Sequence, residues 1–215
     1  MGNAAMADIA GWMSGQMMGN IVSNIATEIK FLNSNADREI YENDRGGGGS
    51  QGLAAIMLWT SMVKAHAPWD HKKYIRQNFG EWCLDEIMMV KYRYDMWSNI
   101  HYGYVGLAVG FDLGVLKSGA GLAQAWDNKP TLSDVASFLT LSELKAFWGS
   151  VSLASAKQRW KAASFSLPSF DDPKDQAAID VGGRLWSDFG AAMSVNDLID
   201  ACRARADELS SRHVV

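Results

Sequence analysis

Apolar residues recur at the spacing of an α-helix along most of this chain, and this periodicity constrains the fold more than any other feature. Four apolar residues at helical spacing predict an amphipathic helix over 19–32. Comparable patterns predict helices over 53–64, 79–90, 94–111, 114–126, 133–138, 142–148, 173–189 and 195–209. Apart from one short strand over 91–93, strand-like alternation is hard to find. We therefore expect an all-α fold, a single compact helical domain with an N-terminal helical appendage.

Two of these helices carry clear start signals. Asp172 precedes Pro173, which combines an N-cap carboxylate with a proline at the first helical position. Ser194 is followed three residues later by Asp197, the spacing of a capping box. Both signals fix where the last two helices should begin.

A glycine-rich run divides the chain. Residues 44–52 read DRGGGGSQG, a flexible tether that cannot pack and matches a natural glycine tract as well as an engineered linker. We therefore expect an N-terminal helical segment over 1–45, which is also readable as the end of a longer parent protein. A linker over 46–52 and a helical domain over 53–215 follow.

Composition excludes several classes of protein. Twenty Lys and Arg against twenty-four Asp and Glu give a net charge of −4, which argues against stable DNA binding but allows a nuclease that meets its substrate at a cleft. No apolar run is long enough to span a membrane, and the N-terminus lacks the basic region of a conventional signal peptide. Cys83 and Cys202 are expected as buried free thiols.

The densest group of polar and aromatic residues lies over 92–111. On a helix, three glycines share one stripe with Asp95, Asn99 and Tyr102, and glycine lets another backbone approach closely. His101 falls on a different face. A continuous helix would therefore keep Asp95 and His101 apart, whereas a helix that starts after His101 would let them meet.

Two further segments offer charged side chains. The sequence PWDHKK at 68–73 places an acid, a base and a cation in consecutive positions, where Asp70 suits a helix N-cap and Lys72 could face a phosphate. The sequence FDDPKDQ at 170–176 brings three carboxylates together. Carboxylates of this density either bind a hard divalent cation or cap a helix.

Taken in order, four motifs resemble the bacterial polymorphic toxin type 44 family. They are PWDHK at 68–72, RYDMWSNIHYGYVG at 93–106, GAGLAQ at 119–124 and DDPKDQ at 171–176. The resemblance covers 33–186. It implies a helical toxin domain that bacterial secretion machinery delivers to competing bacteria, and a cognate immunity protein in the producer.

A second, local resemblance concerns Tyr94, Asp95 and His101, whose spacing is similar to the Tyr-Asp-x5-His pattern of colicin M-type lipid II phosphatases. Tyr92 and Tyr102 stand where those enzymes carry an acid and an arginine. Those domains also contain much β-structure, which differs from the helical pattern of this chain.

These features favour an antibacterial toxin that hydrolyses a phosphate ester or anhydride with a divalent cation, Mg²⁺ or Ca²⁺. Asp95, Asp172 and Asp175 would hold the metal, which would activate water. His101 would transfer protons as general base or acid, and Lys72 would orient the phosphate. The expected catalytic residues are thus His101, Asp95, Lys72 and Asp70.

The expected substrate contacts are Asn99, Tyr102, Trp69 and Trp97. Acidic net charge and abundant Trp favour the lipid-linked peptidoglycan precursor over RNA, and hence the periplasm of the target cell over its cytoplasm. Three alternatives stay open: an RNase, a peptidoglycan glycosidase with Glu81 as acid, and a non-catalytic membrane-acting toxin that uses its Met-rich N-terminal stretch.

Overall fold

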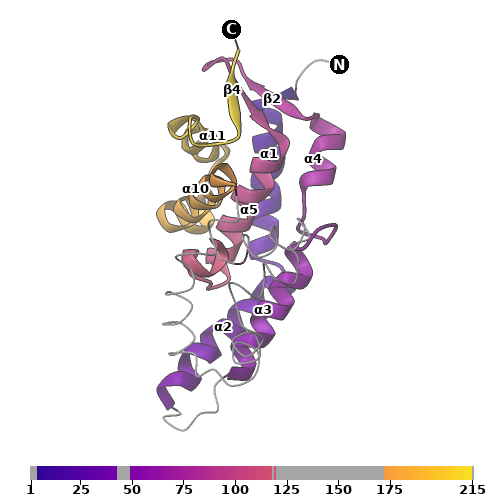
Figure 1. Cartoon of the computed structure of the whole chain (residues 1–215). Coiled ribbons are helices and arrows are strands. Elements are labelled where there is room, and N and C mark those ends of the chain that lie inside the picture. Colours follow the sequence, from indigo (N-terminus) through magenta and orange to yellow (C-terminus); the bar gives the residue numbers. More distant parts are fainter. Residues whose placement is uncertain (1–3, 43–48, 118, 120–171, 215) are drawn as a thin grey trace, which may run out of the picture.

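The computed structural model describes residues 4–42, 49–117, 119 and 172–214, and these are mostly helical (Figure 1). Seven helices have the following bounds: α1 (Met6–Ile21), α2 (Asn24–Glu42), α3 (Gly49–Val63), α4 (Lys72–Phe79), α5 (Tyr94–Ala108), α10 (Pro173–Phe189) and α11 (Val195–Ala204). A 3-10 turn, η2 (Gly190–Ala192), follows α10. The helices expected over 133–138 and 142–148, and most of the one over 114–126, lie outside the described residues.

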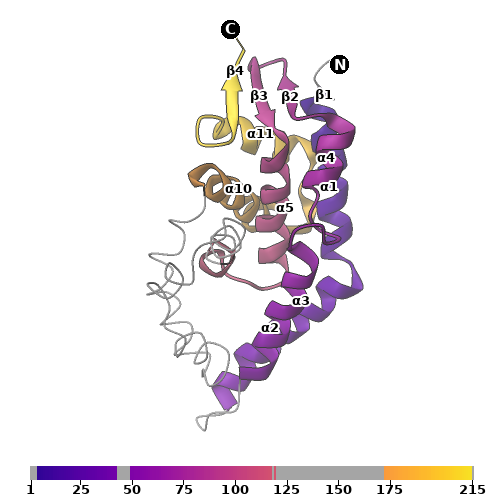
Figure 2. The same cartoon turned by 45° about the vertical axis from the view of Figure 1, so that its right-hand side comes forward.

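A four-stranded sheet corrects the all-α expectation. Its strands β1 (Ala4–Ala5), β2 (Trp82–Asp85), β3 (Val90–Arg93) and β4 (Ser211–His213) are ordered β1-β2-β3-β4. β1 pairs with β2 in parallel, and the other two pairs are antiparallel. The fold is therefore mostly α, with a small mixed sheet at one end (Figure 2).

The helix predicted over 79–90 is wrong, because β2 and β3 form a hairpin there. Gly80 has a φ of 88°, a left-handed conformation that ends α4. Side chains of β2 then alternate between partly and fully buried, as the period of a strand requires. Asp85 closes the turn by accepting hydrogen bonds from the backbone of Ile87 and Met88 at 3.1 and 3.4 Å. The short strand expected over 91–93 is confirmed as part of β3.

Helix α1 lies in the core, which corrects the expectation of a helical appendage for this segment. Met13 and Met17 are fully buried, and Ile9 is nearly so. They belong to the same hydrophobic core as Trp97 and Ile100 of α5. Both views show α1 running alongside α5 (Figures 1 and 2). The Met-rich stretch therefore forms packed core.

Of the three glycines expected to permit close packing, Gly103 does so where α5 crosses α10, together with Gly182 of α10, whereas Gly106 packs against Leu116 and Gly110 against Asn33. A Cβ on Gly103 would lie 2.2 Å from the carbonyl oxygen of Ile179, and one on Gly182 would lie 2.0 Å from that of Ile100. No real Cβ comes so near a backbone oxygen. The two helix backbones are thus in direct contact, and any side chain at either glycine would push them apart.

Both predicted N-terminal caps are confirmed. The Asp172 side chain accepts a hydrogen bond from the backbone of Lys174 at 2.9 Å, with Pro173 opening α10. Ser194 and Asp197 form a reciprocal capping box at the start of α11. That last helix ends at Ala204, earlier than the expected 209.

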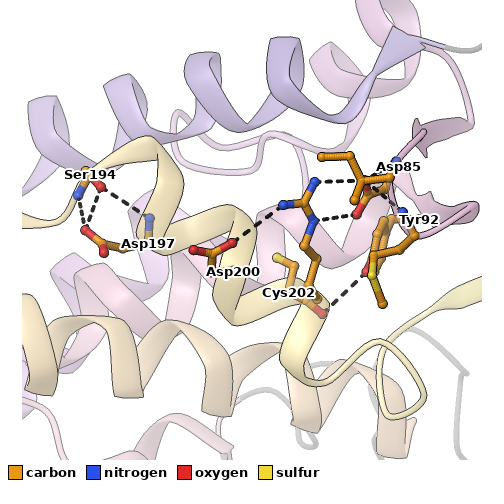
Figure 3. A network of polar contacts seen from close by, with 9 residues as sticks. Asp85, Tyr92, Ser194, Asp197, Asp200 and Cys202 are labelled. Atoms are coloured by element: carbon orange, nitrogen blue, oxygen red, sulfur yellow. Dashed lines mark hydrogen bonds and ion pairs between the residues drawn. The ribbon is translucent and has the colours of Figure 1, made fainter.

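A buried ion pair joins α11 to the hairpin (Figure 3). Both carboxylate oxygens of Asp85 accept hydrogen bonds from Arg203, at 2.7 and 2.9 Å. The Arg203 guanidinium, through its hydrogen bonds, holds the pKa of Asp85 below its ordinary value. Cys83 and Cys202 are buried free thiols, as expected, and burial raises the pKa of Cys83 to about 12.

Candidate active site: a buried histidine pair

The continuity of α5 decides between the two arrangements left open by the sequence. This helix already begins at Tyr94, so Asp95 lies in its first turn and His101 lies six residues further on. At 100° and 1.5 Å per residue, their side chains leave the axis about 120° apart and about 9 Å along it. Asp95 instead pairs with Arg93 at 3.3 Å. The structure therefore does not bring Asp95 and His101 together.

His101 meets a different partner, His71. The two imidazole rings lie with centroids 4.4 Å apart and planes at 89°. His71 stands immediately before α4, and its backbone N–H donates to Ser98 Oγ of α5 at 3.3 Å. This contact fixes the entry of α4 against α5. His71 is 5% exposed and His101 is fully buried.

Aromatic side chains from two further segments surround the pair. Trp12 of α1 lies edge-on to His71 with ring centroids 5.4 Å apart, and Trp69 lies 6.3 Å from His101. Trp59 of α3 packs in turn against Trp69 at 5.8 Å. The histidines therefore sit in a low-dielectric, aromatic environment.

One hydrogen bond defines the tautomer of His101. The Asn20 side-chain amide nitrogen lies 2.8 Å from His101 Nε2. An amide nitrogen can only donate, so Nε2 accepts and the ring proton resides on Nδ1. His101 Nδ1 and His71 Nε2 have no hydrogen-bond partner in the described part of the chain. Both nitrogens are buried, so another molecule reaches them only when the packing around the pair opens.

Burial keeps both histidines neutral. It lowers the pKa of His71 from 6.5 to about 4, an effect that the charge of Asp70 only partly offsets. The pKa of His101 is lowered further, first by burial and then by the neighbouring His71. At neutral pH each ring therefore has one nitrogen that donates and one that accepts, the combination that proton transfer requires.

Asp70 and Lys72 flank His71 in the chain but are not part of the ring pair. Asp70 accepts hydrogen bonds from the backbone of His66 and of Lys72, at 2.9 and 3.3 Å. It thereby closes the turn before α4, but the N-cap of α4 is His71, so the N-cap position expected for Asp70 is wrong by one residue. Lys72 is the first residue of α4 and is partly buried beside His71.

The residues expected to bind a metal are not gathered. In the described ranges, no group of three or more His, Cys, Asp and Glu side chains is arranged as a metal site. Asp95 pairs with Arg93, while the exposed Asp172 caps α10. Asp175 is in the first turn of the same helix. Binding of Mg²⁺ or Ca²⁺ by these carboxylates stays a prediction that the geometry does not support.

The four expected substrate contacts have different surroundings. Trp69 touches His101, whereas Trp97 is wholly buried in the core. Tyr102 donates a hydrogen bond to the backbone oxygen of Leu116 at 3.1 Å. Asn99 is partly buried, and its amide nitrogen has no acceptor among the described residues. Only Trp69 therefore borders the histidine pair by direct ring contact.

Glu81, the alternative catalytic acid, lies just before β2. Its side chain is exposed, and its backbone oxygen accepts a hydrogen bond from Tyr94 at 3.0 Å. An exposed carboxylate lacks the apolar surroundings that raise the pKa of a glycosidase acid. The location therefore offers the glycosidase alternative no support.

Three residues of this site were not among the sequence candidates. His71 lies inside the PWDHK motif, so the motif marks the correct segment, although the sequence favours its neighbours Asp70 and Lys72 as the catalytic residues. Trp12 and Asn20 come from α1, which the sequence placed apart from the domain. No local pattern marks them, because their role arises from packing across the core.

The described part of the chain is thus a mostly helical domain that buries two histidines from separate motifs. Comparison with known families assigns the chain to one of them. The family described as Bacterial toxin 44 matches residues 58–188, more than half of the chain, and the chain belongs to this family. No curated protein and no solved structure was found to match.

Membership makes the chain a bacterial toxin domain of the antibacterial kind. Such toxins are secreted or delivered into target cells, and they generally pair with cognate immunity proteins. The matched region contains both His71 and His101, while α1 lies outside it. Among the residues described, no helix is long and apolar enough to cross a membrane.

Proposed function

We propose that this toxin is a hydrolase of phosphate esters or anhydrides, that His71 transfers the protons and that His101 stabilises the reacting phosphate by a hydrogen bond. The observation that supports this proposal most is the pairing itself. Two histidines from different motifs lie 4.4 Å apart between their ring centroids, and each keeps one nitrogen that has no hydrogen-bond partner among the described residues. Buried polar atoms are rarely left unpaired without a functional reason.

The chemistry divides between the two rings. In hydrolysis, a base removes a proton from the attacking water and an acid protonates the leaving oxygen. His71 Nε2 is the acceptor for the water proton, and the imidazolium so formed gives this proton to the leaving oxygen. His101 Nε2 already accepts from Asn20, so Nδ1–H of His101 stays on the ring and stabilises the phosphate oxygens by a hydrogen bond. The bond from phosphorus to the leaving oxygen breaks as the new P–O bond forms, and both rings are neutral again at the end.

The low pKa values fit this scheme once substrate is bound. A phosphate group is anionic, and a nearby negative charge raises the pKa of a histidine. Binding would therefore raise the pKa of His71 toward the pH at which this ring exchanges protons efficiently. Lys72, beside His71 at the start of α4, supplies a positive charge that would orient the phosphate.

The favoured substrate is the lipid-linked peptidoglycan precursor, with RNA as the alternative. Trp12, which is partly exposed beside His71, offers apolar surface that suits sugar or lipid, and the net charge of −4 disfavours long contacts with RNA. The periplasm of the target cell is the corresponding compartment. The metal-assisted version with Asp95, Asp172 and Asp175 is the less supported variant of the same reaction.

Turnover of the purified precursor and of RNA tests the proposal. His71→Gln and His101→Gln should each reduce phosphate-bond cleavage about 100-fold or more. His66→Gln and His213→Gln are matched controls, because both of these histidines are exposed whereas the pair is buried, and they should retain activity. Circular dichroism would verify that all four variants remain folded.

The outcomes separate the candidate functions. Full activity in both variants of the pair would refute the proposal. Cleavage of RNA alone would assign the RNase alternative. Release of muropeptides from sacculi that depends on Glu81 would assign the glycosidase, and depolarisation of target cells by the His71→Gln variant would assign a membrane-acting toxin.

A further inference from the structure

The turn between β2 and β3 exposes three consecutive large apolar side chains. Ile87, Met88 and Met89 are 77%, 47% and 49% exposed. Tight turns are usually built from Gly, Asn, Asp, Ser or Pro, so an apolar triplet at this position is unusual. The turn projects from the end of the molecule that is opposite α2 and α3 (Figure 2).

This turn, which we call the apolar tip, is held in place by its surroundings. Asp85 binds the backbone of Ile87 and Met88, and the backbone N–H of Val214 donates to the Met89 oxygen at 2.8 Å. The buried Asp85–Arg203 pair anchors its base to α11. The exposed apolar side chains therefore belong to an ordered element of the fold.

Cations lie directly behind the apolar tip on one face of the sheet, and an indole lies further along the hairpin on the same face. Lys91 of β3 and Arg212 of β4 are opposite each other in the strand register. The Arg212 guanidinium lies 4.0 Å from the centre of the Trp82 ring. Like charges directly opposite on neighbouring strands destabilise a sheet. Neither Lys91 nor Arg212 has a carboxylate within ion-pair distance among the described residues.

Acidic residues near the tip are few. Glu86 is exposed in the turn, and Asp207 pairs with His213 at 3.5 Å. Arg93 shares the face of Lys91, and its charge is matched by Asp95. The two cations opposite each other are therefore the main unmatched charge of this face.

From these observations we propose that the apolar tip and the Lys91–Arg212 face bind the surface of an anionic phospholipid bilayer. The order of side chains along the hairpin matches the layers of a membrane. Apolar residues come first, for the acyl chains, and an indole and two cations follow at the depth of the headgroups. A protein partner would not require this order, whereas charge complementarity selects anionic lipid. The inference does not depend on the hydrolase chemistry.

Vesicle flotation of the full chain tests this inference. The protein should float with vesicles that contain phosphatidylglycerol and float far less with vesicles of phosphatidylcholine alone. An Ile87→Asp, Met88→Asp double variant should lower the partition coefficient at least about tenfold, because two apolar side chains no longer enter the bilayer. A Lys91→Gln, Arg212→Gln double variant should lower binding to phosphatidylglycerol vesicles about tenfold or more and remove the preference for anionic lipid.

Phe31→Asp is the matched control. Phe31 is also a large exposed apolar residue, 59% exposed, but it lies on α2. This variant should bind vesicles as the unmodified chain does. Circular dichroism would confirm that each variant is folded. Failure of the unmodified chain to float with phosphatidylglycerol vesicles, or equal binding by the folded tip variant and the unmodified chain, would overturn the inference.

Discussion

His71 and His101 show how burial changes the chemistry of single residues. Exposed histidines are partly charged near neutral pH, yet these two are neutral because charging them would place a cation among tryptophans. The unfolded chain does not impose this restriction. The two histidines therefore bind fewer protons in the folded chain than in the unfolded one at mildly acidic pH, and stability must depend on pH.

The His71→Gln, His101→Gln double variant tests this dependence. In the unmodified chain, the free energy of unfolding should fall as pH drops from about 6.5 toward 4, because the unfolded state takes up protons that the folded state refuses. With a pKa of about 4 for His71, this residue alone accounts for roughly 2–3 kcal/mol between pH 7.5 and 4.5.

The measurement is urea denaturation of both proteins at these two pH values. Carboxylates titrate in both proteins, so the difference between them isolates the histidines. The double variant should lose less stability on acidification than the unmodified chain. Equal losses would show that the histidines are not held neutral by the fold.

At the scale of elements, the crossing of α5 and α10 should be the least tolerant contact to substitution. Gly182→Ala would place a Cβ 2.0 Å from the Ile100 backbone oxygen, and backbone cannot rotate away as a side chain can. We expect a loss of about 3 kcal/mol or more. Gly11→Ala on α1 is the matched control, since nothing lies within 4 Å of its Cβ.

Thermal unfolding distinguishes these two substitutions. Gly11→Ala should be neutral or raise stability by roughly 0.5–1 kcal/mol, because alanine restricts the unfolded chain and favours a helix. A Gly182→Ala variant that unfolds at the temperature of the unmodified chain would contradict the direct backbone contact.

The Asp85–Arg203 pair is a second contact between elements, and it joins the hairpin to α11. Arg203→Met should cost roughly 3–5 kcal/mol, because it leaves the Asp85 carboxylate buried without its cation. The Asp85→Asn, Arg203→Met double variant removes that charge and should recover part of the loss. Denaturation of both variants and of Asp85→Asn gives the coupling energy between the two side chains. A coupling energy near zero would show that the ion pair does not stabilise the fold.

Elements differ in how well their sequence predicts them. The caps of α10 and α11 depend on neighbouring residues, so Asp172 and Ser194 mark them correctly. The hairpin was mistaken for a helix because each strand has only four residues, too few to separate the two periodicities. Its stability comes instead from distant partners, β4 and α11, which no local pattern reveals.

At the scale of the whole molecule, the site joins parts of the chain that its sequence separates. Asn20 and His101 are 81 positions apart, and both are needed for the tautomer described above. His101 was predicted from its motif. Its partners could not be predicted, because they are defined by the packing of α1 and α4 against α5.

A chain that starts at residue 53 tests the role of the N-terminal helices. Without α1, the core loses Met13 and Met17, which are both fully buried. We expect this fragment to unfold without a cooperative transition and to lack toxicity. Co-production of residues 1–45 as a separate chain should restore both properties. A cooperative transition in the fragment alone would show that α1 is dispensable.

The hydrogen bond from Asn20 to His101 also determines which part of the chain must be kept when this domain is joined to another protein. The family match begins at residue 58, but the amide that sets the ring proton of His101 comes from α1. A chimera that begins at residue 58 would contain both histidines but would lack Asn20, so the tautomer of His101 would no longer be defined. The segment to be moved in protein engineering is therefore longer than the region that the family matches, and a working chimera must carry α1 with it.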